Sequence, residues 1–290
     1  MSGAGSAGLP ILQQVFHPSD FTPASEVAFV HALKVALLAK AELTILHVSP
    51  KHELDWAEFP GVRSTLERWQ LLPKNSSQSD VAMLGINIKK VQAKHDDPVE
   101  SVTAYLSAHN TDLIVLATDQ QKERGQWLSQ SIAAPIARKS HQMTLFIPKG
   151  ADGFVSARDG SVSLTSILIP VAAIPASQPA VHAAARMAHR LNCPAGVFTL
   201  VHVGDKADMP QLQLPDVPGW SWNTVVRAGD VVDVISETAS GIGASLIVLT
   251  TEGRHGFLDA LRGSESERIL RRAPCPLLAI PAGGFMASLL

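Results

Sequence analysis

The sequence is poor in the features that mark several large classes of protein. It has two cysteines, Cys193 and Cys275, in 290 residues, which is too few for a disulfide framework and is typical of free thiols. The formal net charge of −2 gives no basic excess that would attract nucleic acid or an anionic membrane. No apolar run approaches the roughly 20 residues of a membrane-spanning helix, and the first residues lack the pattern of a secretory signal. We therefore expect a cytoplasmic protein with no membrane or nucleic-acid partner.

Familiar catalytic motifs are also missing. The sequence has no G-x-S-x-G elbow, no Walker phosphate loop and no G-x-G-x-x-G motif. His17, Asp20 and His47 stand near the ends of neighbouring expected strands and could converge on a metal ion. Hydrogen-bonded polar side chains are the commoner explanation of such residues. The sequence thus predicts no metal site and no catalytic residue.

An internal repeat is the main positive feature. The run LIVLAT at Leu113–Thr118 returns as LIVLTT at Leu246–Thr251, 133 residues later. The register continues for about 30 residues beyond each run, so that Ser131 matches Ser264. The chain therefore consists of two homologous domains, which we place at residues 1–149 and 164–290. The segment between them, residues 150–163, is rich in Gly, Asp and Ser and reads as a linker.

Each copy alternates short apolar runs with longer helical patterns, which predicts an α/β fold with a parallel sheet covered on both faces. Thr22-Pro23 and Asp97-Pro98 are typical helix starts, with a capping side chain before proline. In the first copy we expect strands at residues 11–16, 43–48, 86–93, 113–118 and 144–148. In the second copy we expect strands from residue 167, up to residue 203, and at residues 224–228, 246–251 and 277–281.

Four of the five tryptophans lie in two irregular segments, residues 51–80 and 204–222. Each segment follows the second strand of its copy. We expect each to pack as a lid on its own sheet, and the alternative is that the tryptophans bind a partner.

Glycines follow the fourth strand of the second copy. Gly253 and Gly256 come directly after LIVLTT, and Gly263 precedes Ser264 at the start of an expected helix. Backbone N–H groups at such glycines, together with a helix N-terminus, can hold a phosphate at the carboxyl edge of a parallel sheet. The same serine with Glu267 also fits a capping box, which needs no ligand.

The runs ILIPV, LVHV and LIVLTTEGRHG, followed by RGS and RRAPCPLLAIP, resemble a universal stress protein domain. The first copy is similar through HPSDFTPASEVAFVHALKVA, LTILHV and DLIVLAT. The resemblance covers nearly the whole chain, as a tandem member of that family. It implies two homologous open parallel five-stranded sheets in the order 3-2-1-4-5, with helices on both faces. For part of the family it also implies ATP binding through G-x-x-G, a spacer and G-[S/T].

The two copies keep different parts of that site. The family's acidic residue at the end of strand one, which holds the adenosine end, falls on Asp20 in the first copy and on Ala172 in the second. The phosphate glycines of the second copy are replaced by Gln120, Glu123 and Gln130 in the first. The spacer of the second copy has six residues where the nucleotide-binding pattern has nine. Neither copy is therefore complete.

Magnitudes favour the second copy. A carboxylate 4 Å from a phosphate costs roughly 4 kcal/mol at an effective dielectric near 20, whereas one lost charged hydrogen bond costs about 1.5–3 kcal/mol. The resemblance thus predicts an adenine nucleotide (ATP or AMP), with Mg²⁺ accompanying it, in the second domain. The expected binding residues are Pro170, Val171, Ala172, Val203, Thr251, Gly253, Gly256, Gly263 and Ser264, and the degenerate counterparts are Asp20, Val48 and Ser131.

We expect a cytosolic stress-response regulator that at most hydrolyses ATP slowly. The alternative is a structural or interaction protein in which both sites are degenerate and an unknown protein is the partner. A nucleotidyl-transfer enzyme is disfavoured, because HPSDFTP and PVAAIPA after the first strands lack a Gly-Ser-rich loop. The uncharged fifth strands, TLFIP and LLAIP, would be exposed edges. We therefore expect them to pair antiparallel as an intramolecular pseudo-dimer, with a homodimer of the tandem chain as a further step.

Overall fold

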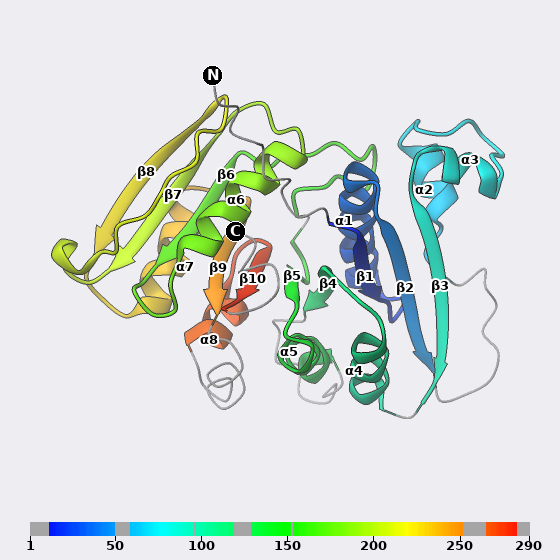
Figure 1. Ribbon diagram of the computed structural model, residues 1–290, viewed down its shortest axis with the longest axis horizontal. Coiled ribbons are helices and arrows are strands. Elements are labelled where there is room, and N and C mark those ends of the chain that lie inside the picture. Colours follow the sequence, from blue (N-terminus) through cyan, green and yellow to red (C-terminus); the bar gives the residue numbers. More distant parts are fainter. Residues whose placement is uncertain are drawn as a thin grey trace, which may run out of the picture.

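The computed structural model describes residues 12–49, 59–95, 97–118, 129–151, 153–251 and 265–282. The two halves each form a five-stranded parallel sheet, and the sheets join edge to edge into one sheet of ten strands (Figure 1). The strand order is β3-β2-β1-β4-β5-β10-β9-β6-β7-β8, so each half has the order 3-2-1-4-5 that the resemblance implied. The chain enters the second half only after completing the first.

The strands of the first half are β1 (Gln14–Pro18), β2 (Glu42–Ser49), β3 (Asn87–Lys94), β4 (Leu113–Thr118) and β5 (Met143–Pro148). Those of the second half are β6 (Ser166–Val171), β7 (Gly196–Val203), β8 (Trp220–Arg227), β9 (Leu246–Thr251) and β10 (Leu277–Pro281). The helices are α1 (Pro23–Ala39), α2 (Val62–Arg68), α3 (Gln78–Met83), α4 (Pro98–Ala108), α5 (Ser129–Ser140), α6 (Gln178–Arg190), α7 (Val231–Gly241) and α8 (Glu265–Arg272), and the short 3₁₀ helix η2 is Lys206–Asp208.

Helix starts follow the capping signals in the sequence. Thr22 caps α1 by accepting the N–H of Ser25, and Asp97 caps α4 by accepting two backbone N–H groups. Asp230 caps α7 in the same way. The proline after Thr22 and after Asp97 occupies a position whose N–H would have no intrahelical partner.

Strand register follows the same pattern in the two halves. Phe16 pairs with Ile114 and Thr44 in the first half, and Leu168 pairs with Ile247 and Thr199 in the second. Corresponding positions of the first strands are therefore 152 residues apart. In this frame Asp20 and Ala172 are equivalent, as the sequence alignment predicted.

The fifth strands form the junction between the halves. β10 pairs antiparallel with β5, and the opposed residues are Leu277 with Phe146, Leu278 with Leu145, and Ala279 with Thr144. Leu145 and Leu278 are equivalent positions of the two copies, so the pseudo-twofold axis passes between them. The predicted intramolecular pseudo-dimer is confirmed by this pairing.

Helices cover both faces of the sheet (Figure 1). The side chains of α1 and α6 belong to one buried cluster, which continues across the junction through Leu145 and Leu278. The side chains of α4, α5, α7 and α8 belong to a second cluster on the opposite face. The apolar strands LIVLAT and LIVLTT contribute to both clusters, because a central parallel strand is buried on both sides.

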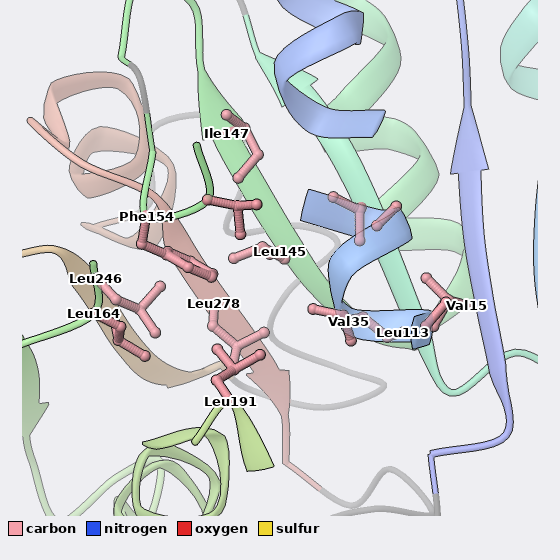
Figure 2. Close-up of a cluster of buried hydrophobic side chains, with 14 of the residues drawn as sticks. Val15, Val35, Leu113, Leu145, Ile147, Phe154, Leu164, Leu191, Leu246 and Leu278 are labelled. Carbon is pink, nitrogen blue, oxygen red and sulfur yellow. The ribbon is translucent and has the colours of Figure 1, made fainter. Parts of the chain in front are cut away.

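The segment between the halves is a packed strap, residues 153–163, and not only a linker. His31 of α1 accepts the backbone N–H groups of Phe154 and Val155 at 3.0 and 3.1 Å. The Trp69 indole N–H donates to the carbonyl of Ala157 at 3.2 Å. Phe154 is fully buried and lies in one cluster with Leu278 of the other half (Figure 2). The strap is therefore fixed to the first half and packs over the junction.

The expected tryptophan lids are only partly found. Trp69 is 5% exposed and lies in the core cluster of its own half, as expected. Trp220 and Trp222 instead lie on β8, where both rings stack on Phe198 of β7 at 4.4 and 4.3 Å. The residues before them do pack on the sheet, because Met209 and Leu212 lie against the core cluster and the Trp222 indole N–H donates to the carbonyl of Pro215 at 3.0 Å. The lid is therefore formed by the residues before β8, and the two tryptophans belong to the sheet. Alternate aromatic residues facing one cross-strand neighbour are a strand pattern, and the prolines before them concealed it.

Candidate functional site

Both halves have a crevice where ligands of open parallel sheets bind. β1 lies between β2 and β4, and β6 lies between β7 and β9. The strand order therefore reverses at β1 and at β6, and ligands of open parallel sheets bind in the crevice at such a point. In the first half this crevice contains a cavity of about 580 Å³, here called the first-half cavity. Its walls come from the carboxyl ends of β1, β2 and β4, the first turn of α1, and α4. This volume suits a small organic ligand.

Two polar side chains of the first-half cavity have capacity left for a ligand. Asp20 accepts both the N–H and the hydroxyl of Thr22 through Oδ1, at 3.0 and 2.7 Å, while Oδ2 has no hydrogen bond to the described residues. Thr118, at the end of β4, is 8% exposed, and its Oγ1 has no partner in the described part of the chain. A buried hydroxyl without a partner costs about 1–3 kcal/mol, which a ligand can recover.

His17 is a core residue and not a ligand-binding group. Its Nδ1–H donates to the carbonyl of Val115 at 3.0 Å, and Ser25 lies 3.4 Å from Nε2. Burial lowers its pKa to about 4, although the Val115 hydrogen bond and the nearby Asp20 charge oppose the shift. The ring is therefore neutral at pH 7.

His47 also has partners within the protein. Its Nδ1–H donates to the carbonyl of Ser19 at 2.7 Å, and the ring stacks on Phe21 at 4.0 Å. In the described ranges, no three His, Cys, Asp or Glu side chains gather as a metal site would require. The two histidines therefore have the hydrogen-bonded polar role that the sequence favoured.

No described helix combines the length and the apolar character needed to cross a bilayer.

The second half repeats this arrangement with one acceptor missing. His202 of β7 is equivalent to His47, and its Nδ1–H donates to the carbonyl of Val171 at 3.0 Å. Ala172 follows, exposed, where the first half has Asp20. The hydroxyl of Ser177 accepts the N–H of Ala172 and donates to its carbonyl, at 2.9 and 3.0 Å. Ser177 thus satisfies both backbone groups of Ala172 at the end of β6.

The residues expected to bind nucleotide in the second half gather at one edge as far as they are described. Val171 ends β6, Val203 ends β7 and Thr251 ends β9, while Pro170 precedes the last residue of β6. The hydroxyl of Thr251 donates to the carbonyl of Ile280 at 3.4 Å. Gly253, Gly256, Gly263 and Ser264 lie outside the described residues.

The degenerate counterparts lie at the same edge of the first half. Val48 is near the end of β2 and lines the first-half cavity together with Asp20. Ser131 falls in the first turn of α5. Gln120 and Glu123 lie outside the described residues.

Sequence reasoning missed three features of these sites. His202 is 7% exposed and its Nε2 has no partner among the described residues. Gly204 lies beside that nitrogen, since a Cβ there would be in ordinary van der Waals contact with it at 3.4 Å. Thr118 and the strap-side residue Lys149 line the first-half cavity without belonging to a motif. The matching histidines of LTILHV and FTLVHV were a usable signal, but their unequal burial depends on three-dimensional contacts.

The comparisons with known proteins agree with this architecture. The profile of the universal stress protein family matches residues 13–148 and 218–281. A universal stress protein from Archaeoglobus fulgidus is 16% identical, with 93% of this chain and 97% of that one covered at a TM-score of 0.60. A functionally unknown protein from Pseudomonas aeruginosa PAO1 is 12% identical, with 96% and 95% covered at a TM-score of 0.60.

A universal stress protein in complex with cAMP is 20% identical over 47% of this chain and 97% of its own, with a TM-score of 0.30. None of the curated proteins compared with the chain matches it. The likeness to the two full-length structures shows the fold, and the profile match, which spans most of the chain, shows the family. The chain belongs to the universal stress protein family, with two copies of the domain in tandem.

Proposed function

We propose that this chain is a cytosolic stress-response regulator that binds an adenine nucleotide, ATP or AMP, in its second half. The observation that carries the proposal is the unpartnered Nε2 of His202. Because Nδ1–H is committed to Val171, Nε2 is an acceptor, and it lies at the strand edge where a nucleotide would bind. An N–H or O–H group of the nucleoside would satisfy it.

The rest of the proposed site follows from chemistry at the same edge. Thr251 ends β9 immediately before the segment that contains Gly253 and Gly256. Glycine N–H groups and the N-terminus after Gly263 would hold the phosphates, with Mg²⁺ accompanying them. No catalytic residue is assigned, so the nucleotide acts as a signal and not as a substrate of rapid turnover. An unidentified protein partner would read that signal.

Calorimetric titration of ATP into matched variants tests the location. His202→Phe removes the unpartnered acceptor, and His47→Phe makes the same change at the equivalent position of the first half. Gly256→Glu adds a carboxylate beside the expected phosphates. We expect His202→Phe to weaken binding about tenfold and Gly256→Glu to abolish it, while His47→Phe leaves it within about twofold. Unchanged affinity in Gly256→Glu would refute the assignment to the second half.

A second candidate is a nucleoside-like ligand in the first half, favoured by the first-half cavity. Asp20 and Thr118 both face this cavity, so it offers a carboxylate and a hydroxyl to a ligand with hydroxyl groups. The absence of phosphate glycines and the presence of Glu123 suit a ligand without a polyphosphate. Adenosine titrated into Asp20→Asn and Ala172→Asn separates the sites, because only the first substitution would weaken binding here.

The rival function is an interaction protein that binds no nucleotide. Mass spectrometry of small molecules released from freshly purified protein distinguishes the two. Adenine nucleotide at a substantial fraction of one per chain supports the proposal. Its absence, together with no calorimetric response to ATP, AMP or adenosine, favours the interaction protein.

A further inference from the structure

A separate cavity lies on the junction of the two halves. It has a volume of about 110 Å³ and is here called the junction cavity. Val35 and Leu38 of α1 form one side, residues of α6 form the other, and Leu113, Met143 and Leu278 form the sheet side. It lies between α1 and α6, over residues of β4, β5 and β10. The strap places Phe154 near Leu278 (Figure 2).

Two positive charges line this apolar space. Arg186 and Arg190 are one turn apart on α6, and both border the junction cavity. Neither forms an ion pair or hydrogen bond with a carboxylate of the described residues, and no residue that lines the cavity is acidic. Burial, and then repulsion from Arg190, lower the pKa of Arg186 to about 10. The guanidinium remains charged at pH 7, so the pair of charges has no counterion from the described chain.

We propose that the junction cavity binds an amphiphilic monocarboxylate with a short alkyl body. The carboxylate would lie between the guanidinium groups of Arg186 and Arg190, whose planar N–H forks match its geometry. The alkyl body would lie against Leu38, Leu113 and Leu278, because these side chains offer no hydrogen bond. A space of this size holds on the order of eight water-sized groups, which corresponds to a chain such as octanoate. A nucleotide does not fit this description, since the walls offer its base and ribose no polar partner.

Methionine methyl NMR gives a direct readout with octanoate as the probe. Met143 and Met187 line the junction cavity, whereas Met83 is 84% exposed on α3. In the full chain labelled at methionine methyl groups, octanoate should shift the Met143 and Met187 signals in a saturable manner and leave Met83 unchanged. Acetate and inorganic phosphate should not compete, because they carry the charge without the chain, and octanol should bind more weakly.

Variants test the role of the charges. Arg186→Gln should weaken octanoate binding at least tenfold, and Arg186→Lys, which keeps the charge but loses the fork, should weaken it less. Arg63→Gln, at an exposed position of α2, is the matched control and should bind as the wild type does. Gly256→Glu should also bind octanoate normally, so failure of the nucleotide proposal leaves this one intact.

Several results would overturn the proposal. These are equal octanoate affinity in Arg186→Gln and wild type, displacement by inorganic phosphate, or no saturable shift at Met143 and Met187. Shifts of these two signals with protein concentration alone would show that the cavity is a contact between copies of the chain.

Discussion

Single side chains distinguish the two halves more sharply than their folds do. His47 and His202 occupy the same position, and each donates through Nδ1 to the carbonyl one residue before the end-of-strand position. At that position the first half has a carboxylate, Asp20, and the second has a methyl group, Ala172. One side chain therefore decides whether the crevice presents a negative acceptor.

Restoring the carboxylate should strengthen nucleoside binding. Ala172 is exposed, so an aspartate fits there without displacing a buried group. We expect Ala172→Asp to improve the affinity for adenosine and ATP by about 1 kcal/mol, or roughly fivefold, through a charged hydrogen bond to the ligand. Calorimetry checks this, with Ala172→Asn as the uncharged control. Weaker binding of adenosine in the aspartate variant would show that this strand end is not the nucleoside pocket.

His31 should make stability depend on pH. Its Nδ1–H donates to Val27, and Nε2 accepts two N–H groups of the strap, so only the neutral ring fits. Burial lowers its pKa to about 4, whereas the unfolded value is about 6.5. The unfolded state therefore binds more protons between these values, and the free energy of unfolding falls as pH falls from 6.5 to 4. His17 adds a similar loss, and each amounts to roughly 3 kcal/mol.

Urea unfolding from pH 7.5 to pH 4.5 measures this dependence. His31→Gln keeps an acceptor for the strap but cannot titrate, so it should lower the slope by about 1.4 kcal/mol per pH unit. Met83→Gln, a change at an exposed residue that carries no titrating group, should leave the slope unaltered. If the glutamine variant retains the full wild-type slope, His31 is not a titrating group in this range.

At the scale of elements, runs of apolar residues predicted the strands, and capping residues predicted the helix starts. LIVLAT, LIVLTT and LLAIP coincide with β4, β9 and β10, and the capping residues Thr22 and Asp97 start α1 and α4. These signals are local, because each lies within a few residues of the structure it sets. The pairing of β5 with β10 was also predictable, since two uncharged edges need cover.

Contacts between segments that are distant in the sequence could not be predicted from it. Phe154 lies in a stretch whose Gly, Asp and Ser content indicates a loop, yet His31, 123 residues earlier, holds its backbone. The prolines at positions 210, 215 and 218 made the start of β8 look irregular. The first-half cavity and the unpartnered nitrogen of His202 likewise depend on side chains brought together by the fold. Two features of the expected site could be predicted from the sequence. These are the equivalence of Asp20 and Ala172, and the position of Val171, Val203 and Thr251 at the ends of neighbouring strands.

The junction strands give a charge-swap test. Leu145 and Leu278 are directly opposed, and both are 1% exposed or less. Leu145→Lys with Leu278→Lys places like charges opposite each other, whereas Leu145→Lys with Leu278→Glu places opposite charges there. Both pairs should destabilise the chain, but the Lys–Glu pair should be the more stable by at least about 1 kcal/mol. Calorimetric unfolding measures the difference, and Met83→Lys is the exposed control. Equal stability of the two pairs would contradict the pairing.

For the whole molecule, the β5–β10 pairing and the strap join the two halves through one buried cluster, so we expect the halves to stay together when the chain is cut. Arg158 lies at an exposed turn of the strap, with its side chain 88% exposed. A protease site inserted between Arg158 and Asp159 should therefore be cut readily. The cut chain should still migrate as a single particle on size exclusion, while a denaturing gel shows two pieces. Separation of the pieces under native conditions would mean that the β5–β10 junction is weaker than its buried residues indicate.

Asymmetry at the junction has a consequence for how the two copies change over time. A homodimer of the first half would oppose Thr144 with Phe146 twice, and a homodimer of the second would oppose Leu277 with Ala279 twice. The tandem chain instead opposes Leu277 with Phe146 and Ala279 with Thr144, one bulky pair and one small pair. Covalent linkage thus releases each copy from self-complementarity, so that a mutation on one side need not be repeated on the other. The same freedom lets the two sequences differ elsewhere, as they do at Gln120, Glu123 and Gln130 against Gly253, Gly256 and Gly263.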